Sequence, residues 1–123
     1  MKILLEDRLF SRLIKLRDKC KCVRCGTIHD ISSKGLHCSH FWGRSNWATR
    51  YDEENCDTLC FACHNRWEEN KQGEYRDFKL KQLGRRKYNE LEKRAMSNAR
   101  KITILTPELR RELKEKIKKY GIR

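Results

Sequence analysis

The chain has 123 residues, of which 37% are hydrophobic and 38% are charged, and its net charge is +13. This length fits one domain, or a small domain with helical extensions, and so little apolar material builds a modest core that benefits from a crosslink. No stretch approaches the roughly 18 apolar residues of a membrane span, and the first ten residues are too short and too acidic for a secretion signal. We therefore expect a cytoplasmic protein whose thiols stay reduced.

The positive charge lies toward the two ends of the chain. Residues 1–21 carry a net charge of +4, residues 71–97 carry +5 and residues 98–123 carry +6, whereas residues 22–70 carry −2. For any single lysine, a solvated surface position is the simpler interpretation. The asymmetry as a whole favours a nucleic acid as partner. A membrane surface fits less well, because the basic segments lack Trp or Phe on an apolar face.

The predicted elements begin with a helix over residues 4–19, where leucines recur at helical spacing. The segment LHCSHF (36–41) has the composition of a strand, residues 42–55 form a long polar loop, and CDTLC (56–60) is a short second strand. From Cys63 onward the pattern turns helical. The leucines of the first helix are Leu5, Leu9, Leu13 and Leu16.

A last helix is indicated by TPELRRELKEKIKKYG. Thr106 can cap it, Pro107 takes the first helical position, and Gly121 follows its end. Its apolar stripe predicts a contact with the core or with a partner helix. The stripe consists of Leu109, Leu113 and Ile117.

Two C-x-x-C pairs, 34 residues apart, predict a zinc site made of Cys22, Cys25, Cys60 and Cys63. Each pair forms a tight turn that presents two thiolates, and four thiolates complete the tetrahedral shell of Zn²⁺. Such a closed shell is structural, since it leaves no open coordination position. Cys20 competes with Cys22 as a ligand, but C-x-x-C-G is the better turn. The two remaining cysteines, Cys38 and Cys56, are expected to be buried as small apolar residues.

Three polar residues occur in the order His40, Asn55 and His64, from the segment between the two zinc-binding turns to the end of the second turn. With zinc joining the turns, the segment between them becomes a hairpin-like excursion whose two ends, at His40 and His64, come close together. His64 directly follows a zinc ligand and lies at a helix start. A single histidine such as His40 is more often a packed or surface residue, but the order His, Asn, His after C-x-x-C favours a nuclease.

Three motifs carry a resemblance: C-V-R-C-G, S-H-F and C-F-A-C-H, with Asn55 between the last two. Their order resembles the HNH endonucleases, which have a ββα-metal fold with a four-cysteine zinc knuckle. The segments HFWGRSNWATRYDEENCDTLCFACHN and GEYRDFKLKQLG are similar, more specifically, to phage recombination proteins of the NinG type, some of which resolve DNA junctions. The similarity runs from about Cys22 to Gly84, and the terminal helices lie outside it.

The resemblance implies an α+β fold with a small HNH core stapled by the zinc site. We expect an N-terminal basic helix (1–21), the nuclease domain (22–84) and a C-terminal basic helical extension (85–123). By position, His40 is implied as the general base that activates water, Asn55 as the residue that holds the loop, and His64 as a ligand of a catalytic Mg²⁺ or Mn²⁺.

One departure concerns the catalytic ion. Many HNH enzymes have a metal-binding Asp or His directly before the base, whereas this chain has Ser39, and the NinG-type relatives also have a small residue there. An ion held by His64 alone would bind weakly, so a second ligand is needed. Asp57, a hard oxygen donor that opens the second strand, is the first candidate, although a strand-end carboxylate without a metal fits equally well. His37 is the second candidate.

Two arginines of the long loop, Arg44 and Arg50, could orient a phosphate in a bidentate way, or they are solvated loop charges. Trp42 and Trp47 could stack on bases, or pack against the zinc knuckle. Taken together, the residues favour a metal-dependent DNA endonuclease, with branched DNA as one substrate class. The alternative is a zinc-ribbon DNA-binding protein without catalysis. A homodimer is compatible with a junction resolver, which must cut two strands.

Overall fold

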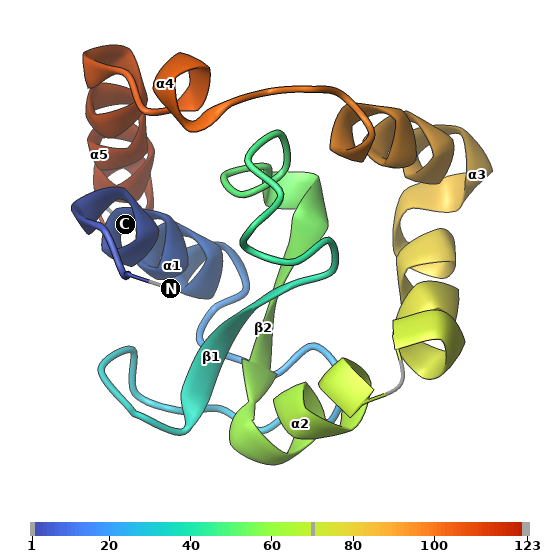
Figure 1. Cartoon of the computed structure of the whole chain (residues 1–123). Helices are drawn as coiled ribbons and strands as arrows, with labels where there is room; N and C mark the ends of the chain where they lie inside the picture. Colours follow the sequence, from blue (N-terminus) through green and yellow to red (C-terminus); the bar gives the residue numbers. More distant parts are fainter. Residues whose placement is uncertain (1, 70, 122–123) are drawn as a thin grey trace.

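The computed structural model describes residues 2–69 and 71–121. β1 and β2 pair antiparallel and are followed directly by α2, which gives a ββα unit at the centre of the molecule (Figure 1). The predicted α+β class is confirmed. In chain order the elements are α1 (Leu5–Arg17), β1 (Leu36–His40), the 3₁₀ turn η1 (Glu53–Asn55), β2 (Cys56–Cys60), α2 (Phe61–Glu69), the short helical segment η2 (Lys71–Tyr75), α3 (Arg76–Ala95), α4 (Lys101–Ile104) and α5 (Pro107–Gly121).

The register of the hairpin decides which side chains share a face. His40 pairs with Cys56, and Ser39 pairs with Asp57. Because successive strand residues point to opposite faces, Cys38, His40 and Cys56 lie on one face of the hairpin, and Ser39 and Asp57 lie on the other.

The face that carries Cys56 packs against α1, and α5 lies beside α1 in the same core (Figure 1). α1 contributes Phe10, Leu13 and Ile14 to this core, at the spacing of one helix face. The expected stripe is therefore only partly right, because Leu13 is buried whereas Leu5 is 43% exposed.

The stripe of α5 belongs to the same core. Leu113 is 3% exposed and packs with the buried residues of α1, and Leu109 and Ile117 contact this cluster from the same helix. The backbone N–H of Leu109 donates to the hydroxyl of Thr106, as expected of a capping residue. Since the stripe packs inside the chain, it gives no support to a dimer.

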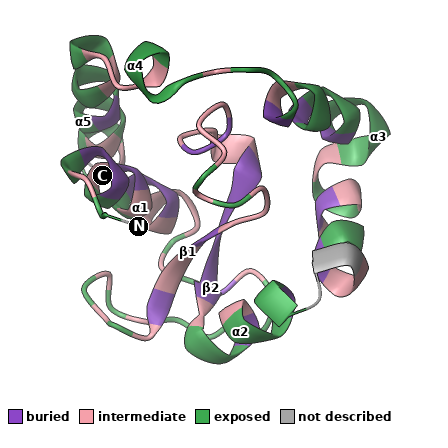
Figure 2. Ribbon diagram, viewed as in Figure 1, coloured by how far each residue is buried: buried purple, intermediate pink, exposed green. Residues whose placement is uncertain are grey.

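The opposite face of the hairpin carries a second core, built with α2 and the segment that follows it. In Figure 2 the buried residues of both cores lie on the strands and on the helix sides that face them, while the outer helix sides are exposed. The Trp67 ring stacks on the Tyr75 ring, with 4.4 Å between the centroids. The buried members of this core are Cys22, Leu59, Cys63, Trp67 and Tyr75.

α3 bends at Gly84, whose φ of +81° is the left-handed conformation that glycine adopts without strain. Beyond the bend, Tyr88 and Leu91 are buried and the Asn46 amide donates to the Ala95 carbonyl. The division into domains at residues 21 and 84 stays a prediction, and both flanking regions contact the centre of the molecule. Among the described residues, no helix is both long enough and apolar enough to cross a lipid bilayer.

Candidate active site and metal centres

The first metal centre is formed by the four predicted cysteines Cys22, Cys25, Cys60 and Cys63, whose sulfur atoms all lie within 4.8 Å of one another. The sulfur atoms of Cys25 and Cys60 are 3.7 Å apart. Thiolates at about 2.3 Å from a tetrahedral Zn²⁺ are separated by about 3.8 Å, so the donor set fits this ion. Cys20, the rival of Cys22, is not part of this cluster. The four cysteines are positioned for a structural zinc ion.

The residues around these cysteines fix the shape of the first turn and place a positive charge beside the sulfur atoms. Gly26 closes the first turn with a φ of +81°, and its N–H donates to the Cys22 carbonyl. The Arg24 guanidinium donates to the Cys63 sulfur at 3.4 Å, which places a positive charge beside the cluster. Such partners outside the ligand shell orient the ligands and tune the metal site.

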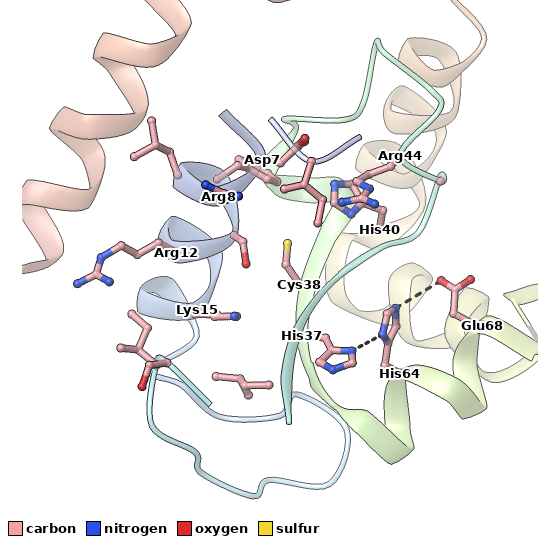
Figure 3. A pocket seen from close by; sticks show the side chains of 18 residues that line it. Asp7, Arg8, Arg12, Lys15, His37, Cys38, His40, Arg44, His64 and Glu68 are labelled. Carbon is pink, nitrogen blue, oxygen red and sulfur yellow. Dashed lines mark hydrogen bonds and ion pairs between the residues drawn. The ribbon is translucent and has the colours of Figure 1, made fainter. Parts of the chain in front are cut away.

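A pocket of about 1130 Å³ lies between α1, β1 and the start of α2 (Figure 3). Three of the four histidines of the chain line it: His37, His40 and His64. The structure therefore brings the predicted base and the predicted metal ligand to one concave site, although they lie on different elements. Four cationic side chains also line this pocket: Arg8, Arg12, Lys15 and Arg44.

His40 is held in one tautomer. Its Nε2 lies 3.0 Å from the Arg50 carbonyl oxygen, and because a carbonyl only accepts, Nε2 carries the proton and Nδ1 keeps its lone pair. Burial lowers the pKa of His40 to about 4, and the positive charge of Arg44 acts in the same direction. The imidazole is thus neutral at pH 7, with one nitrogen ready to accept a proton.

The lowered pKa predicts a pH-dependent stability. Between pH 4 and 6.5 the unfolded chain binds a proton at His40 that the folded chain does not, so the free energy of unfolding falls as the pH falls through this window. We expect this residue to remove about 2 kcal/mol between pH 7.5 and pH 5. Urea denaturation of the wild type and of His40→Gln, both with a single equivalent of zinc per chain, isolates the contribution. An equal change with pH in the two proteins would contradict it.

The loop between β1 and β2 is held by Asn55, which is fully buried. Its amide oxygen accepts from the Trp42 N–H at 2.7 Å, and its amide nitrogen donates to the carbonyls of Trp42 and Thr49 at 2.9 and 3.0 Å. One side chain therefore ties the beginning and the end of the loop together. The residue after Thr49 is Arg50, so the bond from Asn55 holds the backbone next to the carbonyl that orients His40.

Arg50 is not available to a phosphate, contrary to the prediction. Its side chain is 1% exposed, and its guanidinium forms a bidentate pair with Asp7, at 2.9 and 2.7 Å. It also lies over the Trp47 ring, 4.2 Å from the centroid. Arg50 instead fixes the loop that presents its carbonyl to His40, whereas Arg44 lies in the pocket beside His40 (Figure 3).

The structure also contradicts the prediction that Asp57 is a ligand of the catalytic ion. The pairing of Asp57 with Ser39 places its side chain on the hairpin face opposite to His40. The carboxylate is fully buried and is bonded to the Tyr75 hydroxyl at 2.9 Å, the Lys79 ammonium at 2.9 Å and the Gln82 amide. It stabilises the packing of α3 on the hairpin, and the structure does not bring it to the pocket that contains His64.

His64 lies instead against His37, the second candidate, and beside Glu68 on the next turn of α2 (Figure 3). The two Nδ1 atoms are 2.8 Å apart, His37 Nε2 is 3.0 Å from the Lys34 carbonyl oxygen, and His64 Nε2 is 3.6 Å from a Glu68 oxygen. Two neutral imidazoles satisfy the first two contacts, because His37 Nε2–H donates to the Lys34 carbonyl and His64 Nδ1–H donates to His37 Nδ1. The contact with Glu68, at 3.6 Å, is longer than a hydrogen bond.

The spacing of the His37 and His64 Nδ1 atoms fits two ligands of a divalent ion. Two ligands on neighbouring corners of an octahedron, at 2.0–2.1 Å from the metal, lie about 2.9 Å apart, close to the separation of the two Nδ1 atoms. The partners of the two Nε2 atoms are a carbonyl and a carboxylate, which are the usual partners of metal-binding histidines.

The prediction missed the basic wall of the pocket, which α1 supplies. Arg8, Arg12 and Lys15 follow one another at intervals of four and three residues, so that they lie on one face of the helix. This spacing was visible in the sequence. It could have distinguished these three cations, which share one helix face, from the other basic residues among residues 1–21.

A family model, described as the bacteriophage lambda NinG protein, matches residues 3–121. The chain belongs to the NinG family. Membership implies a role related to phage recombination. The match includes α1 and α5, so the expectation that the terminal helices lie outside the similarity is wrong. Comparisons with curated proteins and with solved structures gave no significant match.

Proposed function

We propose that this chain is a metal-dependent endonuclease that hydrolyses phosphodiester bonds of DNA, with an HNH-type ββα unit as its catalytic core. The observation that carries the proposal is the joint position of His40 and His64 in one basic pocket, with His40 held in the tautomer that a base requires. Membership of the NinG family adds a phage recombination context, which favours branched DNA as substrate.

In this mechanism His40 is the general base. Its Nδ1 accepts a proton from the attacking water, and the positive charge that develops on the ring is stabilised through the Nε2–H bond to the Arg50 carbonyl. Because Arg50 is fixed by Asp7, the ring keeps its orientation during proton transfer.

His37 and His64 would hold the catalytic ion through their Nδ1 atoms, and Glu68 would orient the His64 ring from its Nε2 side. When bound, a divalent ion supplies Lewis-acid stabilisation of the negative charge on the phosphoryl and leaving oxygens. Two imidazoles favour Mn²⁺ over Mg²⁺, because Mg²⁺ prefers oxygen ligands. Arg44 and the cations of α1 would hold the phosphate backbone, since guanidinium groups match phosphate oxygens in geometry and charge.

The second candidate, a zinc-ribbon DNA-binding protein without catalysis, explains the four cysteines and the basic helices. It gives no reason for a half-buried His40 that is fixed in one tautomer in the same pocket as the pair of His37 and His64. Nicking of a supercoiled plasmid in Mn²⁺ or Mg²⁺ separates the two candidates, because a pure binding protein retards the plasmid without cutting it. A panel of labelled four-way junctions, flaps, nicked and plain duplexes then identifies the preferred DNA structure.

Removing an ion ligand should change the metal dependence of cleavage. We expect His64→Ala and His37→Ala to need at least 10- to 100-fold more Mn²⁺ for half-maximal nicking, because each variant loses a nitrogen donor. Zinc content, measured by atomic emission, should stay at the wild-type value. His29→Ala is the matched control, because His29 does not line the pocket. An unchanged Mn²⁺ requirement in both variants would remove the pair from the proposed ion site.

A further inference from the structure

A second cluster of metal-binding atoms lies outside the four-cysteine site. The sulfur atoms of Cys38 and Cys56 and a ring nitrogen of His40 all lie within 4.8 Å of one another. The hairpin register explains this arrangement, since His40 pairs with Cys56 and Cys38 stands two residues before His40 on the same face. Both cysteines were expected only to fill space, and Cys56 is indeed fully buried.

The cluster opens toward the pocket. Cys38 and His40 line it, and Figure 3 shows both on the pocket side of β1. Cys56 closes the cluster from the core side, next to Phe10 and Leu13. A metal ion could thus arrive from the pocket and would meet three protein ligands, with a fourth position directed to the solvent.

Two thiolates and one imidazole form a ligand set that selects soft or borderline metals such as Zn²⁺ and discriminates against Mg²⁺ and Mn²⁺. The two thiolate charges neutralise Zn²⁺, so the occupied site carries no net charge into the apolar core around Cys56. The other ring nitrogen of His40 is bonded to the Arg50 carbonyl, as in many metal-binding histidines. Nδ1 is then the nitrogen that faces the metal.

We propose that Cys38, His40 and Cys56 form a second, exchangeable zinc site, and that zinc at this site inhibits cleavage by occupying the nitrogen that serves as the base. The binding part stands on the ligand cluster alone. The inhibition part rests on the proposed nuclease function. The four-cysteine site differs from it in having a closed shell, so its zinc is expected to exchange much more slowly.

Metal stoichiometry tests the binding part. The full chain carrying His64→Ala, which removes the proposed site of the catalytic ion, is dialysed against buffered Zn²⁺ at pH 7.5 and its zinc content is measured. On this background we expect two zinc ions per chain, one after the further change Cys38→Ser or His40→Ala, and two after the control change Cys20→Ser, whose cysteine lies outside both clusters. Circular dichroism verifies that each variant is folded. One zinc ion in the His64→Ala protein, or two after Cys38→Ser in a folded chain, would overturn the site.

Cleavage assays test the inhibition part. In Mn²⁺, added Zn²⁺ beyond the first equivalent should lower plasmid nicking by the wild type at least 10-fold, and by Cys38→Ser less than 2-fold. Equal inhibition of the two proteins would overturn the regulatory role. If the wild type cuts no DNA under any condition, the nuclease proposal fails, whereas the zinc stoichiometry still decides whether the second site exists.

Discussion

Replacing His40 with alanine should lower the rate of DNA cleavage by about 10²- to 10⁴-fold, which is the usual contribution of a positioned general base. The loss follows from the geometry, because His40 Nδ1 is the nitrogen that the Arg50 carbonyl leaves unprotonated in the basic pocket. DNA binding should persist, since the cations of α1 and Arg44 remain. The measurement is single-turnover cleavage of labelled DNA at saturating Mn²⁺, together with a binding assay on the same substrate.

Two comparisons make the result specific. His29→Ala removes a histidine outside the pocket and should cut at the wild-type rate. The pKa of about 4 predicts that protonation of His40 in the free protein limits activity only below about pH 5, so the rate should not fall between pH 7 and pH 6 on its account. Cleavage by His40→Ala at the wild-type rate would rule out this residue as the base.

Removing zinc from the four-cysteine site should unfold the centre of the molecule. Zinc binding to structural thiolate sites contributes about 10 kcal/mol or more, which is comparable to the whole stability of a small domain. Two of the ligands, Cys22 and Cys63, are themselves part of the core that contains Trp67 and Tyr75. A strong chelator, or Cys60→Ser, should therefore abolish the near-ultraviolet circular dichroism and the cooperative thermal transition.

The controls distinguish the effect of losing zinc from the effect of replacing a cysteine. Cys20→Ser should keep its zinc and its thermal transition, because Cys20 is not one of the clustered cysteines. Adding zinc back to the chelated wild type should restore the transition, whereas Cys60→Ser should not recover. A metal-free wild type with an intact transition would show that the cluster does not stabilise the fold.

Local patterns in the sequence predicted the elements that depend on local chemistry. The C-x-x-C pairs located the zinc ligands, because only a tight turn presents two thiolates to one ion. Thr106 and the stripe of α5 were found from capping and helical spacing. The stripe of the first helix was predicted only in part: Leu13 belongs to the set that packs on the hairpin, but its partners there are Phe10 and Ile14 and not Leu5.

The errors concern contacts between residues far apart in the chain. Asp57 was predicted as a ligand of the catalytic ion because it is a hard oxygen donor that opens the second strand, but the pairing register turns it to the other face of the hairpin. The prediction for Arg50, a phosphate contact or a solvated loop charge, missed its partner, because Asp7 lies 43 positions earlier. The pair of His37 and His64 depends on how α2 packs beside β1, and strand alternation alone could not give this contact.

The buried pair of Asp7 and Arg50 joins the first helical turn to the loop that orients the base. Asp7 also accepts hydrogen bonds from the Leu4 N–H at the start of α1 and from the Tyr51 hydroxyl. The orientation of the His40 ring, set by the Arg50 carbonyl, therefore depends on Asp7 in the first turn of α1. Shortened or N-terminally fused forms of the protein can therefore be well folded around zinc and yet hold the imidazole at the wrong angle.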